Sequence, residues 1–308
     1  MTITEVSPDI FHNRLPEPAH LYGSVAFSEL NRYKCTDGDL RYLLFSDSRV
    51  RAGLILGRHG HTLHTPFSAP FGGLVVNRTQ RVETIQLIWR TALQYARQQN
   101  LGLRVTLPPE FYDPDTTAKS ILALHELGMS CVLDLNYHVL TRAFCEENCA
   151  SRFRNQLHQA RNAHAEVTLL DSSPESIERV YSIVQQNHFA KHRPVHIPLD
   201  NLIATVPMAQ ARFFAVTHSG CDIAGAMVYT AAPGIAQAIY WGDIPGYGHI
   251  RPMNLLADYI IRYYAAQGVE IVDFGPSTEH GAPNTGLCAF KESFTAIPTI
   301  KPTFSSQV

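Results

Sequence analysis

The chain has 308 residues, a net charge of −2 and an apolar fraction of 45%, which is the composition of a globular protein with one large domain or two medium ones. Lys and Arg (25) nearly balance Asp and Glu (27), so no global basic field indicates a nucleic-acid partner. No apolar stretch approaches the roughly 18 residues that a membrane span needs, and the start of the chain lacks the pattern of a secretory signal, so we expect a cytoplasmic protein.

The first half of the chain is predicted to hold strands, a loop and two helices. Residues 1–20 are polar and carry prolines, which indicates an arm or an early helix. Asp47 and Ser48 separate two apolar runs and predict a hairpin, while two prolines and two glycines make 66–73 a loop. The expected elements are strands at 41–45, 50–56 and 61–65, a helix at 82–99, a strand at 103–107, a helix at 116–127 and a strand at 131–140.

The second half is predicted to begin with helices and to continue with strands. Ser172 and Ser173 are candidate caps for its second helix, and Pro194 lies in a segment with no regular pattern. The expected elements are helices at 150–164 and 174–186, an irregular segment at 187–198, and strands at 212–217, 223–230 and 237–241.

The stretch from Ile239 to Phe294 holds the pattern that most directly predicts a site. One short apolar run ends in Asp243 and a second, Ile271–Phe274, contains Asp273 at its end. Between them an amphipathic helix is expected from the i, i+3, i+4, i+7 spacing of Leu256, Tyr259, Ile260 and Tyr263. Strand, helix and strand at this spacing predict a parallel βαβ unit with a right-handed crossover. Because ligands of open α/β sheets bind at the carboxyl ends of strands, we expect both aspartates near a site.

The two halves share an order of elements: two antiparallel strands, a third strand, a Pro/Gly loop, an amphipathic helix and a short strand. Residues 82–107 in the first half correspond to 253–274 in the second. This order predicts a duplicated α/β unit, with boundaries at 1–145 and 146–308. The alternative is one continuous sheet with insertions.

A hairpin that leads into strand, loop, helix and strand resembles the GNAT N-acyltransferases. In that superfamily a helix N-terminus binds the pyrophosphate of the acyl donor through free backbone N–H groups. The corresponding loop here is 243–252, with Gly246, Gly248 and Arg251 as the expected donor-binding residues. The loop lacks the usual Arg/Gln-x-x-Gly-x-Gly/Ala spacing, so a plain structural turn stays open as the alternative.

The end of the chain resembles the FemAB-like, or BioF2-like, branch of the GNAT superfamily. The carboxy-terminal signature of that branch, fDfG followed by Gl..FK..fG, matches segments 268–275, 284–287 and 290–294, although Thr295-Ala296 replaces the usual final glycine. Segments 70–73 and 108–112 of the first half also resemble this group.

The resemblance implies a fold of two tandem GNAT-like units, each a mixed, mostly antiparallel sheet flanked by helices, with the catalytic site in the second. It implies transfer of an acyl or aminoacyl group from an activated donor, acyl-CoA or aminoacyl-tRNA, to a small-molecule or peptide amine. No cofactor beyond this co-substrate is expected. The alternative is a GNAT-like module that binds a ligand without catalysis, since fold alone does not fix function.

Three residues are the predicted catalytic groups. The resemblance implies a lysine that faces the transfer cleft, which is Lys291 here, and its ammonium would stabilise the negative charge that forms on the carbonyl oxygen. Asp243 or Asp273 would take the proton from the attacking amine as a general base. The alternatives are a surface lysine and an aspartate that caps a loop.

Further residues are predicted to bind the substrate because they lie near these groups in the pattern, or because they form a basic and polar set that suits a phosphate or carboxylate. For the arginines the alternative is a solvated helix face, and for the aromatic residues it is the core. The predicted substrate-binding residues are Tyr240, Trp241, Asn254, Ser277, Arg154, His192 and Arg193.

No metal site is expected. His59, His61 and His64 form one set of histidines, and His188, His192 and His196 form another. Pro194 breaks the helical spacing of the second set, and no acidic partner is visible near either. The six cysteines form no Cys-x-x-Cys pair, which predicts free thiols in a reducing compartment.

Overall fold

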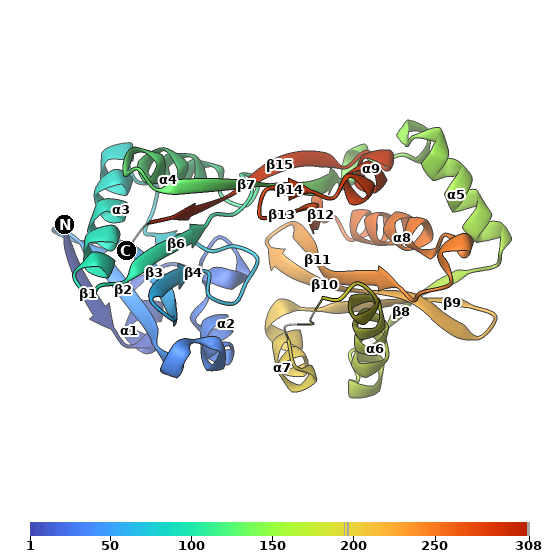
Figure 1. Cartoon of the computed structure of the whole chain (residues 1–308), viewed down its shortest axis with the longest axis horizontal. Coiled ribbons are helices and arrows are strands. Elements are labelled where there is room, and N and C mark those ends of the chain that lie inside the picture. The colour runs from blue at the N-terminus through green and yellow to red at the C-terminus, as the bar shows by residue number, and fades with distance from the viewer. Residues whose placement is uncertain (194, 196, 307–308) are drawn as a thin grey trace. The chain divides into compact units, whose positions relative to one another are not determined.

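A computed structural model describes residues 1–193, 195 and 197–306 (Figure 1). The chain forms two compact units: unit 1 comprises Met1–Leu135, Thr278–Ala282 and Thr299–Val308, and unit 2 comprises Asn136–Ser277 and Pro283–Pro298. These limits differ from the predicted 145/146 boundary, because strand β7 (Ser130–Leu140) contributes to both units and β15 (Ile297–Ser305) ends in unit 1. No described helix combines the length and the apolar character that crossing a bilayer requires.

Unit 1 is a mixed sheet with the strand order β1-β2-β3-β4-β6-β15, and β5 pairs with β3. Among the described residues, neighbouring strands of this sheet pair antiparallel, except β4 and β6, which pair in parallel. The remaining elements are β1 (Thr2–Val6), α1 (Pro8–Arg14), α2 (Val25–Leu30), β2 (Leu40–Ser46), β3 (Val50–His59), β4 (Thr62–Thr65), β5 (Leu74–Val76), α3 (Val82–Arg97), β6 (Gly102–Thr106) and α4 (Pro114–Glu126).

The core of unit 1 lies between its sheet and helices α3 and α4. The amphipathic helix predicted at 82–99 is confirmed as α3, and Ile85, Ile88, Trp89 and Ala92 form its buried face. They pack against strand residues such as Leu54 in one continuous cluster. Burying an aliphatic side chain contributes roughly 1.5–3 kcal/mol, so this face is what fixes α3 to the sheet.

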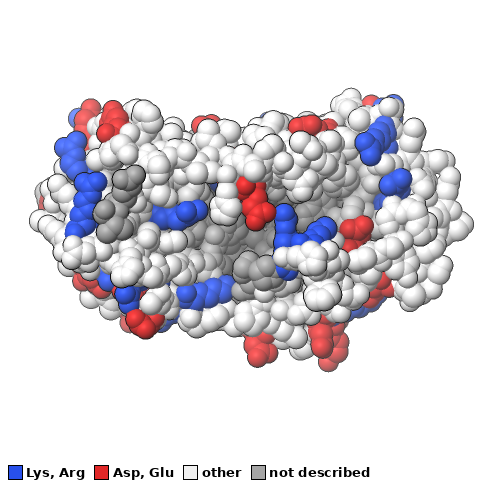
Figure 2. All heavy atoms as spheres, viewed as in Figure 1, with Lys and Arg blue, Asp and Glu red and all other residues white. Residues whose placement is uncertain are grey.

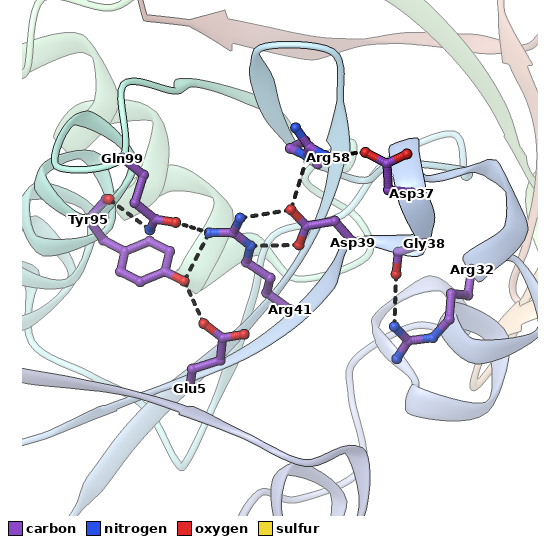
Figure 3. Close-up of polar contacts among 9 residues, drawn as sticks. All are labelled: Glu5, Arg32, Asp37, Gly38, Asp39, Arg41, Arg58, Tyr95 and Gln99. Atoms are coloured by element: carbon purple, nitrogen blue, oxygen red, sulfur yellow. Dashed lines mark hydrogen bonds and ion pairs between the residues drawn. The ribbon is translucent and has the colours of Figure 1, made fainter.

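A polar network around Arg41 ties the sheet of unit 1 to helix α3 (Figure 3). The Arg41 guanidinium donates to both carboxylate oxygens of Asp39 at 2.7 Å and to the Tyr95 hydroxyl at 3.2 Å. Tyr95 in turn donates to Glu5 at 2.7 Å, and Arg58 pairs with Asp39 at 3.0 Å. Strands β1, β2 and β3 and helix α3 are therefore joined by one chain of contacts.

Unit 2 has the strand order β7-β12-β11-β10-β9-β8, and among its described residues only β11 and β12 pair in parallel. Its helices cover both faces of the sheet, with α8 on one face of β10 and β11 and α6 on the other (Figure 1). The elements are α5 (Ser151–Asn162), β8 (Glu166–Leu170), α6 (Pro174–Ala190), α7 (Leu199–Ala209), β9 (Arg212–His218), β10 (Cys221–Ala232), β11 (Ile235–Asp243), α8 (Pro252–Ala266), β12 (Ile271–Pro276) and α9 (Thr285–Ser293).

The parallel βαβ unit predicted for Ile239–Phe274 is confirmed as β11, α8 and β12. The predicted irregular segment at 187–198 is wrong at its start, because α6 continues to Ala190. Strand β8 and helix α7 were not predicted. The five residues of β8 give too short a pattern, and Pro207 lies inside α7, where a proline normally indicates a break.

Candidate active site

The site in unit 2 begins where strands β11 and β12 stop pairing. Their parallel ladder covers only Ile235–Gln237 against Ile271–Asp273, although β11 continues to Asp243. Just beyond this ladder β11 carries a bulge, because Val228 of β10 faces Ala238 and Met227 faces Tyr240. Ile239 is thus the extra residue. A bulge bends its strand and increases its twist, which explains why β11 leaves its parallel neighbour here.

A cleft of about 870 Å³ lies along the unpaired part of β11. It is large enough for a small-molecule substrate. Helices α5, α6, α8 and α9 complete its walls. Its lining residues are Arg152, Gln156, Asn187, His188, Lys191, Arg193, Ile239, Tyr240, Trp241, Gly242, Asp243, Gly248, Arg251, Pro252, Met253, Asn254, Asn284, Gly286, Leu287 and Phe290.

The corresponding region of unit 1 is closed. There β4 pairs with β6 along its whole length, from Thr62 to Thr65. The loop at 66–73 follows β4, and its Phe71 side chain is fully buried against His20, Tyr22 and Tyr112. Two cavities that this loop borders hold about 20 Å³ each, which is room for one water molecule.

Aromatic side chains form one wall of the cleft in unit 2. The Trp241 ring lies 5.0 Å from Phe274 and 5.9 Å from Phe290, measured between centroids. Tyr240 points to the opposite side of β11 and its ring lies 5.5 Å from that of His188. Trp241 packs against the buried ring of Phe274, so this wall offers contact to the apolar part of a ligand.

The charged residues of the cleft are mostly basic. Among its described lining residues four are Arg or Lys, namely Arg152, Lys191, Arg193 and Arg251, and one, Asp243, is acidic. Over the face that Figure 2 draws, positive and negative residues are scattered without a continuous field of either sign. The excess of positive charge in the cleft favours an anionic group there.

The start of helix α8 supplies backbone N–H groups, which are hydrogen-bond donors, at the end of the cleft. Arg251 is its N-cap, with a left-handed φ of 63°, and Pro252 occupies the first turn. The first N–H groups of a helix have no partner within it, and they favour anions. Asn254, buried in the same turn, donates to Gln156 of α5 at 3.3 Å. Of the predicted donor loop, Gly248 and Arg251 line the cleft, whereas Gly246 is not among its described lining residues.

Lys291 lies on the buried side of helix α9, and its side chain is 1% exposed. Its ammonium donates to the carbonyl oxygens of Phe274 and Gly275 at 2.8 Å and of Pro276 at 3.1 Å. Burial lowers the pKa of Lys291 to about 7, and the Asp273 carboxylate opposes that shift. Lys291 is not among the described residues that line the cleft. The geometry therefore favours a structural role, and its catalytic role stays a prediction.

Asp273 is fully buried at the end of the paired part of β12. Its carboxylate accepts from Asn136 and Gln237 at 2.7 Å each and from the N–H of Gly275 at 2.8 Å. These hydrogen bonds are those expected of an aspartate that caps a loop, which was the alternative to a role as a base. Asp243, in contrast, lines the cleft, and its role as a base stays a prediction.

Of the predicted substrate-binding residues, four line the cleft and three are not among its described lining residues. Tyr240, Trp241, Asn254 and Arg193 line the cleft. Arg154 instead donates to the carbonyl oxygens of Glu147 and Cys149. Neither Arg154 nor His192 nor the buried Ser277 is among the described lining residues. Their binding roles stay predictions.

Several lining residues were not among the predicted site residues. Arg152, Gln156, Asn187 and Lys191 come from α5 and the end of α6, far from the signature at the end of the chain. The basic pattern of Arg152 and Lys191 was a signal for two of them. Asn187 gave no signal in the sequence, because its role depends on how α6 packs against β11.

Neither histidine set forms a metal centre in the part of the chain that the structure describes. No group of three His, Cys, Asp or Glu side chains there is placed to hold an ion. His59 and His64 contact each other with centroids 4.8 Å apart, and His59 also contacts the carbonyl oxygen of Phe67. His196, from the second set, lies outside the described residues.

Comparison with known proteins identifies the fold. No family model and no curated protein matches the chain in sequence. Among solved structures, a tandem GNAT protein from the clavulanic acid biosynthesis pathway aligns with a TM-score of 0.57 and 12% identity, covering 99% of this chain and 98% of that one. The protein thus has a tandem GNAT fold, as predicted.

Two further solved structures share this fold. FemX aligns with a TM-score of 0.67 and 11% identity over 100% of this chain and 98% of its own. The C-terminal domain of a putative lysylphosphatidylglycerol synthetase from Agrobacterium fabrum aligns with a TM-score of 0.64 and 13% identity over 98% and 93%. The predicted resemblance to the FemAB-like branch is confirmed at the level of fold.

Proposed function

We propose that unit 2 transfers an acyl or aminoacyl group from an activated donor to an amine. The observation that carries this proposal is the opening in its sheet. The bulge at Ile239 and the short parallel ladder leave a cleft of about 870 Å³ at the carboxyl end of β11, where α/β proteins bind ligands. Its likeness in fold to FemX and to a tandem GNAT protein supports the same reaction class.

The donor binds with its anionic part at the start of α8. Arg251 caps that helix and Arg152 lines the same cleft, and both proposed donors, acyl-CoA and aminoacyl-tRNA, carry phosphate groups that these charges attract. The acyl group then extends along β11 toward Trp241.

The reaction is a direct attack of the amine on the donor carbonyl. Asp243 is the proposed general base, because it is the acidic group of the cleft and takes a proton from the attacking nitrogen. Negative charge forms on the carbonyl oxygen. The backbone N–H of Ile239 is proposed to stabilise it, since a bulge leaves its extra residue outside the ladder. The thiol or the tRNA hydroxyl leaves with the electron pair of the broken bond and gains a proton.

The test begins with a donor screen. Purified protein is heated with acetyl-CoA, longer acyl-CoA esters or aminoacyl-tRNA, and saturable stabilisation identifies the donor. Transfer to an amine is then measured with the wild type and with Asp243→Asn, which keeps the shape of the side chain but cannot act as a base. We expect Asp243→Asn to lose about 10²–10⁴-fold in kcat. Undiminished transfer would remove Asp243 from the mechanism.

A second candidate is a GNAT-like module that binds a ligand without transfer. The burial of Lys291 favours it, because the predicted catalytic ammonium is engaged by three carbonyl oxygens instead of facing the cleft. The same screen decides between the two. Saturable binding of a donor together with no product from any amine would support the binding module.

A further inference from the structure

Asn187 lies at the point where helix α6 touches the end of strand β11. Its side chain is 4% exposed, and it packs directly over the backbone of Gly242. A Cβ atom added at Gly242 would lie 2.4 Å from Cγ of Asn187, which is closer than real side chains approach. The glycine therefore lets the Asn187 amide reach the strand.

The amide of Asn187 bonds to two charged residues of the cleft. Its Nδ2 donates to the backbone oxygen of Asp243 at 2.7 Å and to Oδ1 of the same residue at 3.3 Å, while its Oδ1 accepts from Nζ of Lys191 at 3.0 Å. Only one orientation of the amide allows this, because the Asp243 oxygens accept and an ammonium only donates.

We propose that Asn187 is a positioning residue that holds the Asp243 carboxylate and the Lys191 ammonium in fixed places at the edge of the cleft. This inference rests on the proposed function, in which Asp243 is the base. A neutral amide suits the task, because it orients both groups without adding charge. An error of about 1 Å in the position of a reacting group costs as much as 10²-fold in rate, so the loss of this contact should be visible in kcat.

Two substitutions of Asn187 distinguish the contact with Asp243 from the contact with Lys191. Asn187→Ala removes both contacts. Asn187→Asp keeps the oxygen that accepts from Lys191 but replaces the donor to Asp243 with a second carboxylate. Gln186→Ala is the matched control, because Gln186 is an exposed amide on the same helix and donates to the Ser182 hydroxyl at 3.4 Å.

The first readout is the reactivity of Lys191 toward a trace of acetic anhydride, measured by mass spectrometry. Losing a neutral acceptor should make Lys191 about fivefold more reactive in Asn187→Ala. In Asn187→Asp the acceptor is negative, so Lys191 should react no faster than in the wild type. A merely structural role for Asn187 predicts the same change in both variants.

The second readout is transfer with the donor that the screen identifies. Both variants should lose about 10–100-fold in kcat, with KM for the donor within about twofold of the wild type, because the contact acts on the base and not on donor binding. Gln186→Ala should leave kcat and Lys191 reactivity unchanged.

A double variant separates packing from positioning. Gly242→Ala alone should unfold more easily, because its methyl group meets the Asn187 amide, and adding Asn187→Ala should restore stability by making room. The restored protein should still show the loss of about 10–100-fold in kcat, since the donor to Asp243 is missing. Recovery of kcat in the double variant would overturn the proposal.

Failure of the proposed function is distinguishable from failure of this inference. If wild-type protein transfers no acyl group, the proposed function fails. The positioning of Asp243 and Lys191 is then decided by Lys191 reactivity and by crystals of Asn187→Ala. An unchanged Asp243 side chain and unchanged Lys191 reactivity would overturn it.

Discussion

Asp273 and Lys291 form hydrogen bonds with the two backbone polar groups of Gly275. The N–H of Gly275 donates to Oδ1 of Asp273 at 2.8 Å, and its carbonyl oxygen accepts from Nζ of Lys291 at 2.8 Å. Gly275 has a left-handed φ of 73°, which glycine adopts at little cost. The two charged residues thus fix the turn that ends β12, and both are buried while they do so. Three residues of the family signature, Asp273, Gly275 and Lys291, are thus joined by hydrogen bonds in one turn.

Replacing Lys291 should therefore lower stability. Lys291→Met keeps the aliphatic chain but leaves buried carbonyl oxygens without a donor and the Asp273 carboxylate without a nearby cation. We therefore expect the free energy of unfolding to fall by about 3 kcal/mol. Urea denaturation measures it. Lys119→Met is the control, because Lys119 is partly exposed and its ion pair with Asp115 lies at the surface. A Lys291→Met protein of normal stability that has lost transfer would instead support the predicted catalytic role.

Asp273→Asn should also destabilise the protein, by about 2 kcal/mol. The new amide keeps one oxygen for the N–H of Gly275. The same oxygen still accepts from Asn136, but the NH₂ group replaces the oxygen that accepts from Gln237, and two buried donors that face each other lose a hydrogen bond. Thermal unfolding measures the change. If Asp273→Asn instead unfolds like the wild type and abolishes transfer, the predicted role of Asp273 as a base regains support.

The sequence was sufficient to predict what depends on local pattern. The stripe on α8, the parallel βαβ unit and the place of Asp243 at a strand end all follow from spacing along the chain. Lys291 carried a further local signal: Leu287, Lys291 and Phe294 recur at i, i+4 and i+7, so the lysine occupies an apolar stripe. That spacing predicts a buried side chain more directly than the family signature predicts a catalytic one.

The rest of the site depends on contacts between distant segments. The bulge at Ile239 is a property of the register between β10 and β11, and a register cannot be read from one strand alone. The place of Asn187 likewise depends on how closely α6 approaches Gly242. Sequence patterns identified β11 and the start of α8, but not the parts of α5 and α6 that line the cleft.

Acid should destabilise unit 1 through His20. Burial lowers the pKa of His20 from 6.5 to about 4, and its Nδ1 has no hydrogen-bond partner among the described residues. Between these two values the unfolded chain binds more protons than the folded one, so stability is full above pH 6.5 and falls as the pH drops toward 4, by about 3 kcal/mol in all.

His20→Phe tests this, because it keeps a ring against Tyr22, Phe71 and Tyr112 but cannot titrate. The free energy of unfolding is measured at pH 7 and at pH 4.5 for both proteins. The wild type should lose more stability than the variant. Burial also lowers the pKa of His64 to about 4, and its contribution cancels in the comparison. Equal losses would show that His20 is not the group that responds.

Arg251 offers a test of donor binding in which backbone and charge are separated. Its left-handed φ of 63° costs a non-glycine residue about 1 kcal/mol, so Arg251→Gly relieves backbone strain while it removes the charge at the start of α8. We expect Arg251→Gly to melt at the same temperature as the wild type or higher, yet to bind the donor about tenfold more weakly. Arg251→Lys keeps the charge and should bind with an intermediate affinity. Affinity for the donor is measured by thermal shift at low and at high salt. High salt should weaken donor binding more in the wild type than in Arg251→Gly, because salt screens the charge that the variant lacks. If Arg251→Gly binds the donor as tightly as the wild type, the anionic part of the donor does not lie at this helix.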